Sequence, residues 1–190
     1  MDIKLFLKNN KQKYILPVIY IIFIYLFSIR IMYEFAGYSE IVSNPRWYIF
    51  PLRYGLILTG FLMLFNIINA IYILKINKPS KEILFIAMMI KISFILLYIV
   101  YFIIEVIMFY TIIGIPITVT FFIFGYIVLI PSSFYTICGL IRAIKNNEIS
   151  ILYGICASIL SFILFFDVLS TIVSYIKVKK INFNTTALKK

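Results

Sequence analysis

Five long apolar stretches occupy most of this 190-residue sequence. A helix that crosses a bilayer needs about 20 consecutive apolar residues, and every stretch reaches that length. Only 13% of the residues are charged, whereas an average soluble domain carries about 25%. The stretches lie at about 14–36, 52–74, 83–110, 115–143 and 149–176. The sequence therefore predicts an all-α, polytopic transmembrane bundle of about five membrane-spanning helices, with four as the alternative, forming one integral membrane domain over residues 1–190.

The basic residues between the stretches indicate the orientation, because cytoplasmic loops carry an excess of Lys and Arg. With the N-terminus inside, the cytoplasmic side receives nine: Lys4, Lys8, Lys11, Lys13, Lys75, Lys78, Lys81, Arg142 and Lys145. The opposite side receives seven: Arg46, Arg53, Lys177, Lys179, Lys180, Lys189 and Lys190. The C-terminal tail conflicts with the early loops, so either five helices leave it outside or one stretch does not span. We expect five helices and a cytoplasmic N-terminus.

Composition excludes several kinds of site. The sequence has no histidine, which rules out His-Glu-x-x-His metalloproteases and triads that use histidine as the base. Cys138 and Cys156 lie in apolar stretches without CxxC spacing, which indicates buried free thiols, with a disulfide as the alternative. The net charge of +11 is placed at the ends of the stretches, so nucleic acid is not an expected partner. We expect no catalytic residues, no metal and no cofactor.

Ionisable side chains inside the stretches are the first candidates for function, because a charge at membrane depth is unfavourable and is kept for a reason. With the N-terminus inside, Arg30, Glu34, Glu105 and Asp167 fall in the outer half of the membrane. We interpret these four as helix-pairing charges. The hypothesis is that Arg30 pairs with Asp167 or with Glu105; a local pair with Glu34, four residues further on, is the alternative.

A second set of polar residues falls in the inner half: Lys91, Asn66, Asn69, Ser132 and Ser133. Lys91, Tyr98 and Glu105 are seven residues apart and therefore share one helix face. That face either turns inward as a polar stripe, or Lys91 and Glu105 extend to the two headgroup layers. At its depth Lys91 has no evident counter-charge, which makes it the first candidate for a site within the membrane.

Small and polar residues in other stretches predict how the helices pack. Thr118, Gly125, Ser132 and Gly139 form a heptad row that favours close helix packing, with a ligand path as the alternative. Pro131 should kink its helix, because proline cannot donate the backbone hydrogen bond. Asn66 and Asn69 are expected to form hydrogen bonds between helices.

The segment PSSFYTICGLIRAIK from Pro131 to Lys145, with FFDVLS from Phe165 to Ser170, resembles an uncharacterised family of small multi-pass membrane proteins of Gram-positive bacteria. The stretch from Met88 to Lys91, followed by Tyr98, is also similar to that pattern. The resemblance implies a bacterial plasma-membrane location. It implies no biochemical activity, but it directs attention to Lys91, Ser132, Ser133 and Asp167.

Three functions remain open from the sequence. The leading prediction is a non-enzymatic integral membrane protein that acts through a membrane partner, as an export accessory or an immunity protein would, or as a homo-oligomer. The alternative is a small transporter or channel with a midplane polar site around Lys91. An intramembrane enzyme with a Ser–Lys pair, formed by Lys91 with Ser132 or Ser133, is the third.

Overall fold

The computed structural model describes residues 12–36, 46–76, 78–110, 114–163 and 166–187, and all regular structure in them is α-helical. The helices are α2 (Gln12–Ala36), α4 (Arg46–Lys75), α5 (Ser80–Phe109), α6 (Gly114–Lys145), α7 (Ile151–Leu160) and α8 (Phe166–Ala187). The prediction of an all-α bundle is confirmed. Among the described residues, four helices are long and apolar enough to cross a membrane: α2, α4, α5 and α6.

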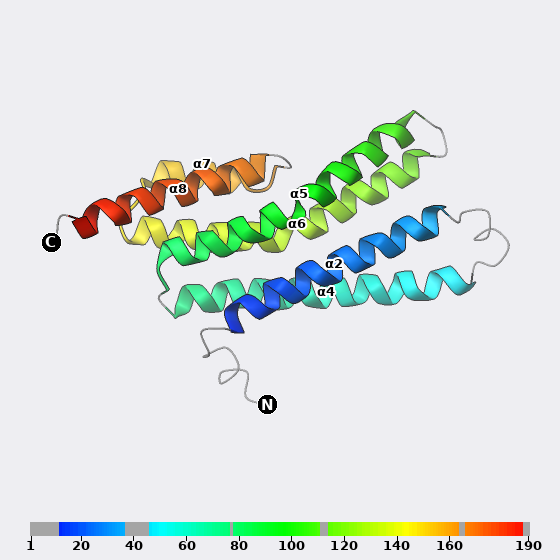
Figure 1. Cartoon of the computed structure of the whole chain (residues 1–190), viewed down its shortest axis with the longest axis horizontal. Coiled ribbons are helices and arrows are strands. Elements are labelled where there is room, and N and C mark those ends of the chain that lie inside the picture. Colours follow the sequence, from blue (N-terminus) through cyan, green and yellow to red (C-terminus); the bar gives the residue numbers. More distant parts are fainter. Residues whose placement is uncertain (1–11, 37–45, 77, 111–113, 164–165, 188–190) are drawn as a thin grey trace.

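The helices form three layers of two (Figure 1). The central layer is the antiparallel pair of α5 and α6, which contacts α2 and α4 on one side and α7 and α8 on the other. Many side chains on the outer faces of these layers are large, apolar and exposed, as expected where lipid replaces water as the solvent. α4 begins at Arg46 rather than near residue 52.

The fifth predicted span, 149–176, is wrong as one continuous helix. α7 ends at Leu160, and α8 begins at Phe166 and runs back beside α7 (Figure 1). The sequence provides the reason for the break. The Ser161 hydroxyl and the Ser161 N–H both donate to the Ser158 carbonyl, at 2.7 and 3.2 Å, which stabilises the end of α7. Asp167 lies in the first turn of α8, where a carboxylate interacts favourably with the helix dipole.

The resulting hairpin enters the bundle from one end and returns to the same end. The ten residues of α7 rise only about 15 Å, half of a hydrocarbon core of about 30 Å. The returning part of α8 packs at the level where α5 begins and α6 ends, because buried Val178 belongs to one cluster with Leu84 and Leu140. The end of α8 therefore lies at the same end of the bundle as the 76–80 and 146–150 turns.

The turn between α6 and α7 follows directly from its sequence. Asn147 has φ of 56°, the left-handed conformation that asparagine tolerates better than most residues. Its N–H donates to the Ile144 carbonyl and the next N–H, of Glu148, donates to the Ala143 carbonyl, both at 2.9 Å. This is a Schellman motif, which ends a helix and satisfies its last carbonyls. Ser150 then caps α7 by accepting from the Tyr153 N–H at 3.4 Å.

Pro131 lies inside α6, as predicted, and α6 changes direction partway along its length (Figure 1). Proline leaves the carbonyl four residues earlier, that of Ile127, without its usual donor. The Tyr20 hydroxyl of α2 takes that place, at 3.3 Å from the Ile127 oxygen and 3.4 Å from the Val128 oxygen. Tyr20 is fully buried. A side chain from another helix therefore compensates for the bond that proline removes.

Replacing Tyr20 by Phe should lower stability by about 1 kcal/mol, because a buried carbonyl loses its donor. The loss should shrink when Pro131 is replaced by Ala, since Ala restores an N–H for the Ile127 carbonyl. Thermal unfolding of the four members of this double-mutant cycle in detergent measures the coupling. Tyr25→Phe is the matched control: its hydroxyl donates to the Ser93 carbonyl, so its cost should not depend on residue 131. Equal costs of Tyr20→Phe in both backgrounds would refute the compensation.

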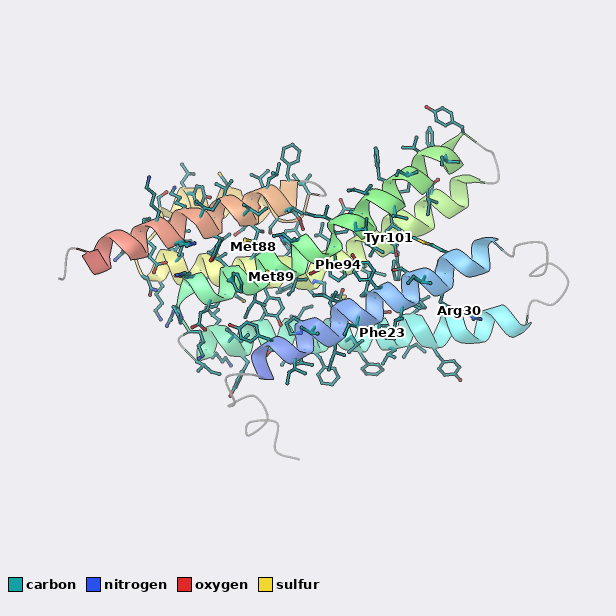
Figure 2. The ribbon with its side chains drawn as sticks, in the orientation of Figure 1. Phe23, Arg30, Met88, Met89, Phe94 and Tyr101 are labelled. Atoms are coloured by element: carbon teal, nitrogen blue, oxygen red, sulfur yellow. The ribbon has the colours of Figure 1, made fainter. Side chains whose placement is uncertain are left out.

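Two further contacts attach α2 to α5. The Ser28 and Tyr101 hydroxyls are hydrogen-bonded at 2.7 Å, and Tyr20 packs edge-on against Phe94 with ring centroids 5.8 Å apart. Figure 2 shows Phe94 and Tyr101 on the side of α5 that faces α2. The first helix is thus held by specific hydrogen bonds as well as by apolar packing, although its own sequence shows little amphipathic pattern.

Candidate functional site

The polar centre of the bundle is an ion pair between Lys91 of α5 and Asp167 of α8. Lys91 Nζ lies 3.3 Å from Asp167 Oδ2, and the exposed fractions of the two side chains are 0% and 1%. Nζ also donates to the Asp167 backbone carbonyl at 3.3 Å. Charges in a medium without water attract strongly, but each also loses its hydration, so such a pair is stable only while both partners are present.

The hairpin explains why these two residues meet. Lys91 lies eleven residues into α5, about 16 Å from its start, and α7 rises about 15 Å before the chain turns. Both side chains therefore reach the same depth near the middle of the bundle. A continuous helix over 149–176 would instead place Asp167 in the opposite half of the membrane. The prediction that Lys91 has no counter-charge at its depth is wrong for this reason.

Hydroxyl groups next to the pair stabilise the first turn of α8. Ser170 and Thr171 both donate to the Asp167 carbonyl, at 3.2 and 2.9 Å. Thr171 is also hydrogen-bonded to Thr136 of α6, with the two hydroxyl oxygens 3.1 Å apart. All of these side chains are buried. We call Lys91, Thr136, Asp167, Ser170 and Thr171 the ion-pair cluster; it joins α5, α6 and α8.

Ser132 and Ser133 are buried beside this cluster, and their hydroxyls are hydrogen-bonded to backbone carbonyls rather than to Lys91. The Ser132 hydroxyl donates to the Leu129 carbonyl within α6 at 2.8 Å. The Ser133 hydroxyl donates to the carbonyl of Ser161, where α7 ends. Both hydroxyl hydrogens are thus used on backbone carbonyls, and the second one attaches the tip of the hairpin to α6.

The two asparagines form a separate polar group between α4 and α6. Asn69 Nδ2 donates to the Tyr135 hydroxyl at 2.7 Å, and the Tyr135 hydroxyl in turn donates to Asn66 Oδ1 at 3.4 Å. Asn66 Nδ2 donates to the Leu62 carbonyl at 2.9 Å. The predicted interhelical hydrogen bonds of Asn66 and Asn69 are therefore present. The five inner candidates do not form one site: the asparagines face Tyr135, and Lys91 faces Asp167.

The outer charges are arranged differently from the hypothesis. Asp167 pairs with Lys91 and not with Arg30, whose side chain is exposed. Glu105 is half-buried and makes no ion pair with any residue that the structure describes. The Glu34 side chain lies outside the described residues, and so does the proposed local pair of Arg30 with Glu34. The polar stripe on α5 does turn inward, because Lys91 is fully buried and Tyr98 is 9% exposed; extension of Lys91 to the headgroups is wrong.

The cysteines and the small-residue row are partly as predicted. Cys138 and Cys156 are both free thiols, but Cys156 is exposed rather than buried. A Cβ on Gly139 would lie 2.7 Å from Leu84 Cγ, so Gly139 does permit close packing of α5 and α6. A Cβ on Gly125 would meet nothing within 4 Å, so the packing row does not extend to it.

Sequence reasoning missed three buried side chains that complete these groups: Tyr20, Tyr135 and Thr136. A signal was present for Tyr20, because Pro131 implies a carbonyl that needs a donor from elsewhere. For Tyr135, the two asparagines implied a polar partner on a neighbouring helix. Nothing local to Thr136 distinguishes it from the other hydroxyl residues of its helix.

Comparison of the chain with protein-family models, with curated proteins and with solved structures finds no match. The resemblance to a family of Gram-positive membrane proteins therefore stays a prediction. The all-helical architecture with four helices suited to a membrane is shown by the structure itself.

Proposed function

We propose that this protein is a non-enzymatic integral membrane protein of the bacterial cell membrane that acts through a membrane partner, as an export accessory or an immunity protein does. The observation that carries the proposal is the use of the buried polar groups. Lys91, the two serines beside the ion-pair cluster, the asparagine amides and the Tyr135 hydroxyl all direct their donors to one another, to Asp167 or to backbone carbonyls. Such groups stabilise a particular arrangement of helices.

The same contacts argue against the Ser–Lys enzyme. A serine nucleophile needs its base within hydrogen-bond reach, whereas the Lys91 ammonium is engaged by Asp167 and both serine hydroxyls donate to carbonyls. The arrangement therefore supports a protein whose outer surfaces act, rather than its interior. Those surfaces are the exposed apolar faces of the outer helices, for example Leu64 and Ile68 of α4, at 55% each.

A transporter or channel is the second candidate, and one observation favours it. The interrupted hairpin brings the N-terminus of α8 and a buried ion pair to mid-membrane depth, beside the proline-interrupted helix α6. Discontinuous helices that meet near the midplane form the binding sites of many transporters. In that case Lys91 and Asp167 would bind the substrate or ion as well as each other.

One experiment separates the two candidates. In the double variant Lys91→Met with Asp167→Leu, apolar side chains of similar size replace both charges, and the fold is expected to persist. A photo-crosslinking amino acid at position 64 or 68 should capture a partner protein from native membranes. The double variant should capture the same partner with the same yield as the chain that retains Lys91 and Asp167. Two results together would favour the transporter and overturn our proposal. The first is loss of the specific cross-link in the double variant, and the second is solute flux into liposomes with the unmodified chain but not with the double variant.

A further inference from the structure

A pocket of about 490 Å³ lies between the first turns of α5 and the middle of α8, and we call it the α5–α8 pocket. Its lining is both charged and aromatic: Pro79, Lys81, Glu82, Phe85 and Tyr175. The rings of Phe85 and Tyr175 are in contact, with centroids 5.8 Å apart. Lys179 belongs to the same group, because its Nζ lies 6.0 Å from the centroid of the Tyr175 ring. The pocket therefore combines an aromatic pair with two ammonium groups.

The lysines and the aromatic rings lie at two levels along the membrane normal. Lys81 precedes Phe85 by four residues and Lys179 follows Tyr175 by four, so each lysine shares a helix face with its ring. Because α5 begins and α8 ends at the same end of the bundle, both lysines lie one turn nearer that end than the rings. Both are exposed, whereas Phe85 is 38% exposed and Tyr175 is half-buried. Charges toward water and aromatic rings toward lipid are typical of the headgroup layer.

The charges of the pocket and of its surroundings favour an anion. Lys81, Lys179 and Glu82 together carry one net positive charge, which matches a single phosphodiester. Against the acidic Glu82 and Glu148, the side chains described at this end of the bundle include eight basic ones: Lys75, Lys78, Lys81, Arg142, Lys145, Lys177, Lys179 and Lys180. Each Lys or Arg near a membrane surface raises the affinity for anionic lipid about fivefold.

An apolar surface continues from the pocket toward the interior of the bilayer. Met89 lies one turn beyond Phe85 on the same face of α5 and is 47% exposed. A soluble phosphate would leave this surface unused, whereas an acyl chain would cover it. We propose that the α5–α8 pocket binds one anionic phospholipid. The Lys81 and Lys179 ammonium groups hold its phosphodiester, and an acyl chain lies over Phe85 and Met89. This site is separate from the proposed partner surface on α4.

The test uses native mass spectrometry of the purified full chain in detergent, with phosphatidylglycerol as the probe. One phosphatidylglycerol should bind about tenfold more tightly than phosphatidylcholine or phosphatidylethanolamine, which carry the same phosphate but no net charge. Lys81→Gln and Lys179→Gln should each weaken that binding about fivefold, and the double variant about 25-fold. Glycerol phosphate, which has no acyl chain, should not displace the lipid at equal concentration.

The matched control is the double variant Lys75→Gln with Lys145→Gln. It removes the same charge from the same end of the bundle, at exposed residues that do not line the pocket, so the affinity should change less than about twofold. An equal loss in this control would overturn the proposal, because the whole basic end would then attract the lipid. Equal binding of the zwitterionic lipids would also overturn it, and so would displacement by glycerol phosphate. A photo-crosslinking amino acid at position 85 that captures a protein from native membranes would show that the occupant is a polypeptide instead.

Discussion

Neutralising only one member of the central ion pair, with Lys91→Met or Asp167→Leu, is expected to destabilise the fold by about 3–5 kcal/mol. Each substitution leaves an opposite charge buried without its counter-ion, since both side chains are almost completely enclosed. The hairpin of α7 and α8 should be affected first, because Asp167 forms the start of α8. Thermal unfolding in detergent, followed by circular dichroism, measures the loss.

The double variant Lys91→Met with Asp167→Leu should recover most of that stability, because no charge remains buried. Exchange of the two residues should recover less. A lysine in the first turn of α8 interacts unfavourably with the helix dipole, where Asp167 interacts favourably. Lys81→Met is the matched control: Lys81 lies in the first turn of the same helix, α5, and is exposed, so its loss should change stability by less than about 0.5 kcal/mol. Additive losses in the double variant would show that the charges are not coupled.

The helices could be predicted from the sequence, because membrane insertion depends on local properties. A run of about 20 apolar residues is sufficient for a span, and the starts and ends of α5 and α6 fall within a few residues of the prediction. The inward stripe through Lys91 and Tyr98 also follows from heptad spacing alone. These features require no knowledge of the neighbouring helices.

The candidate site could not be predicted, because it depends on whether one apolar stretch crosses or folds back. Hydropathy treats 149–176 as a single span, since the break at Ser161 contains no proline and lies in a mostly apolar stretch. A continuous helix over this stretch places Asp167 in the opposite half of the membrane from Lys91, at the depth of Arg30. One topological choice thus determined every pairing among the buried charges.

The charge conflict in the C-terminal tail was the sequence signal for the hairpin. In the structure, the described basic residues at the end of the bundle where α5 begins are Lys75, Lys78, Lys81, Arg142, Lys145, Lys177, Lys179 and Lys180. The other end carries Arg46 and Arg53 at the start of α4, and an excess of basic residues at one end is what the positive-inside rule expects of a membrane protein. The rule therefore favours the alternative in which one stretch does not span, even though the apolar length of that stretch favours five helices.

The hairpin of α7 and α8 predicts that the end of α8 lies on the same side of the membrane as the end of α6. Single-cysteine variants at Lys145 and at Lys180, made after Cys138 and Cys156 are replaced by Ala, should react with a membrane-impermeant maleimide on the same side. A cysteine at Tyr110, which is 85% exposed beyond the end of α5, should react on the opposite side. Both lysines are exposed, so reactivity depends on sidedness rather than on burial.

Intact cells and inverted vesicles distinguish the arrangements. Because eight described basic residues lie at one end, that end should be cytoplasmic: the cysteine at Tyr110 should react in intact cells, and those at Lys145 and Lys180 only in inverted vesicles. The reversed pattern for all three positions would preserve the hairpin and refute the orientation. Reaction at Lys180 together with Tyr110, and not with Lys145, would mean that the stretch from 149 to 176 crosses the membrane. Asp167 would then lie too far from Lys91 for the ion pair to form. In that case the stability losses of Lys91→Met and Asp167→Leu should be additive in the double variant.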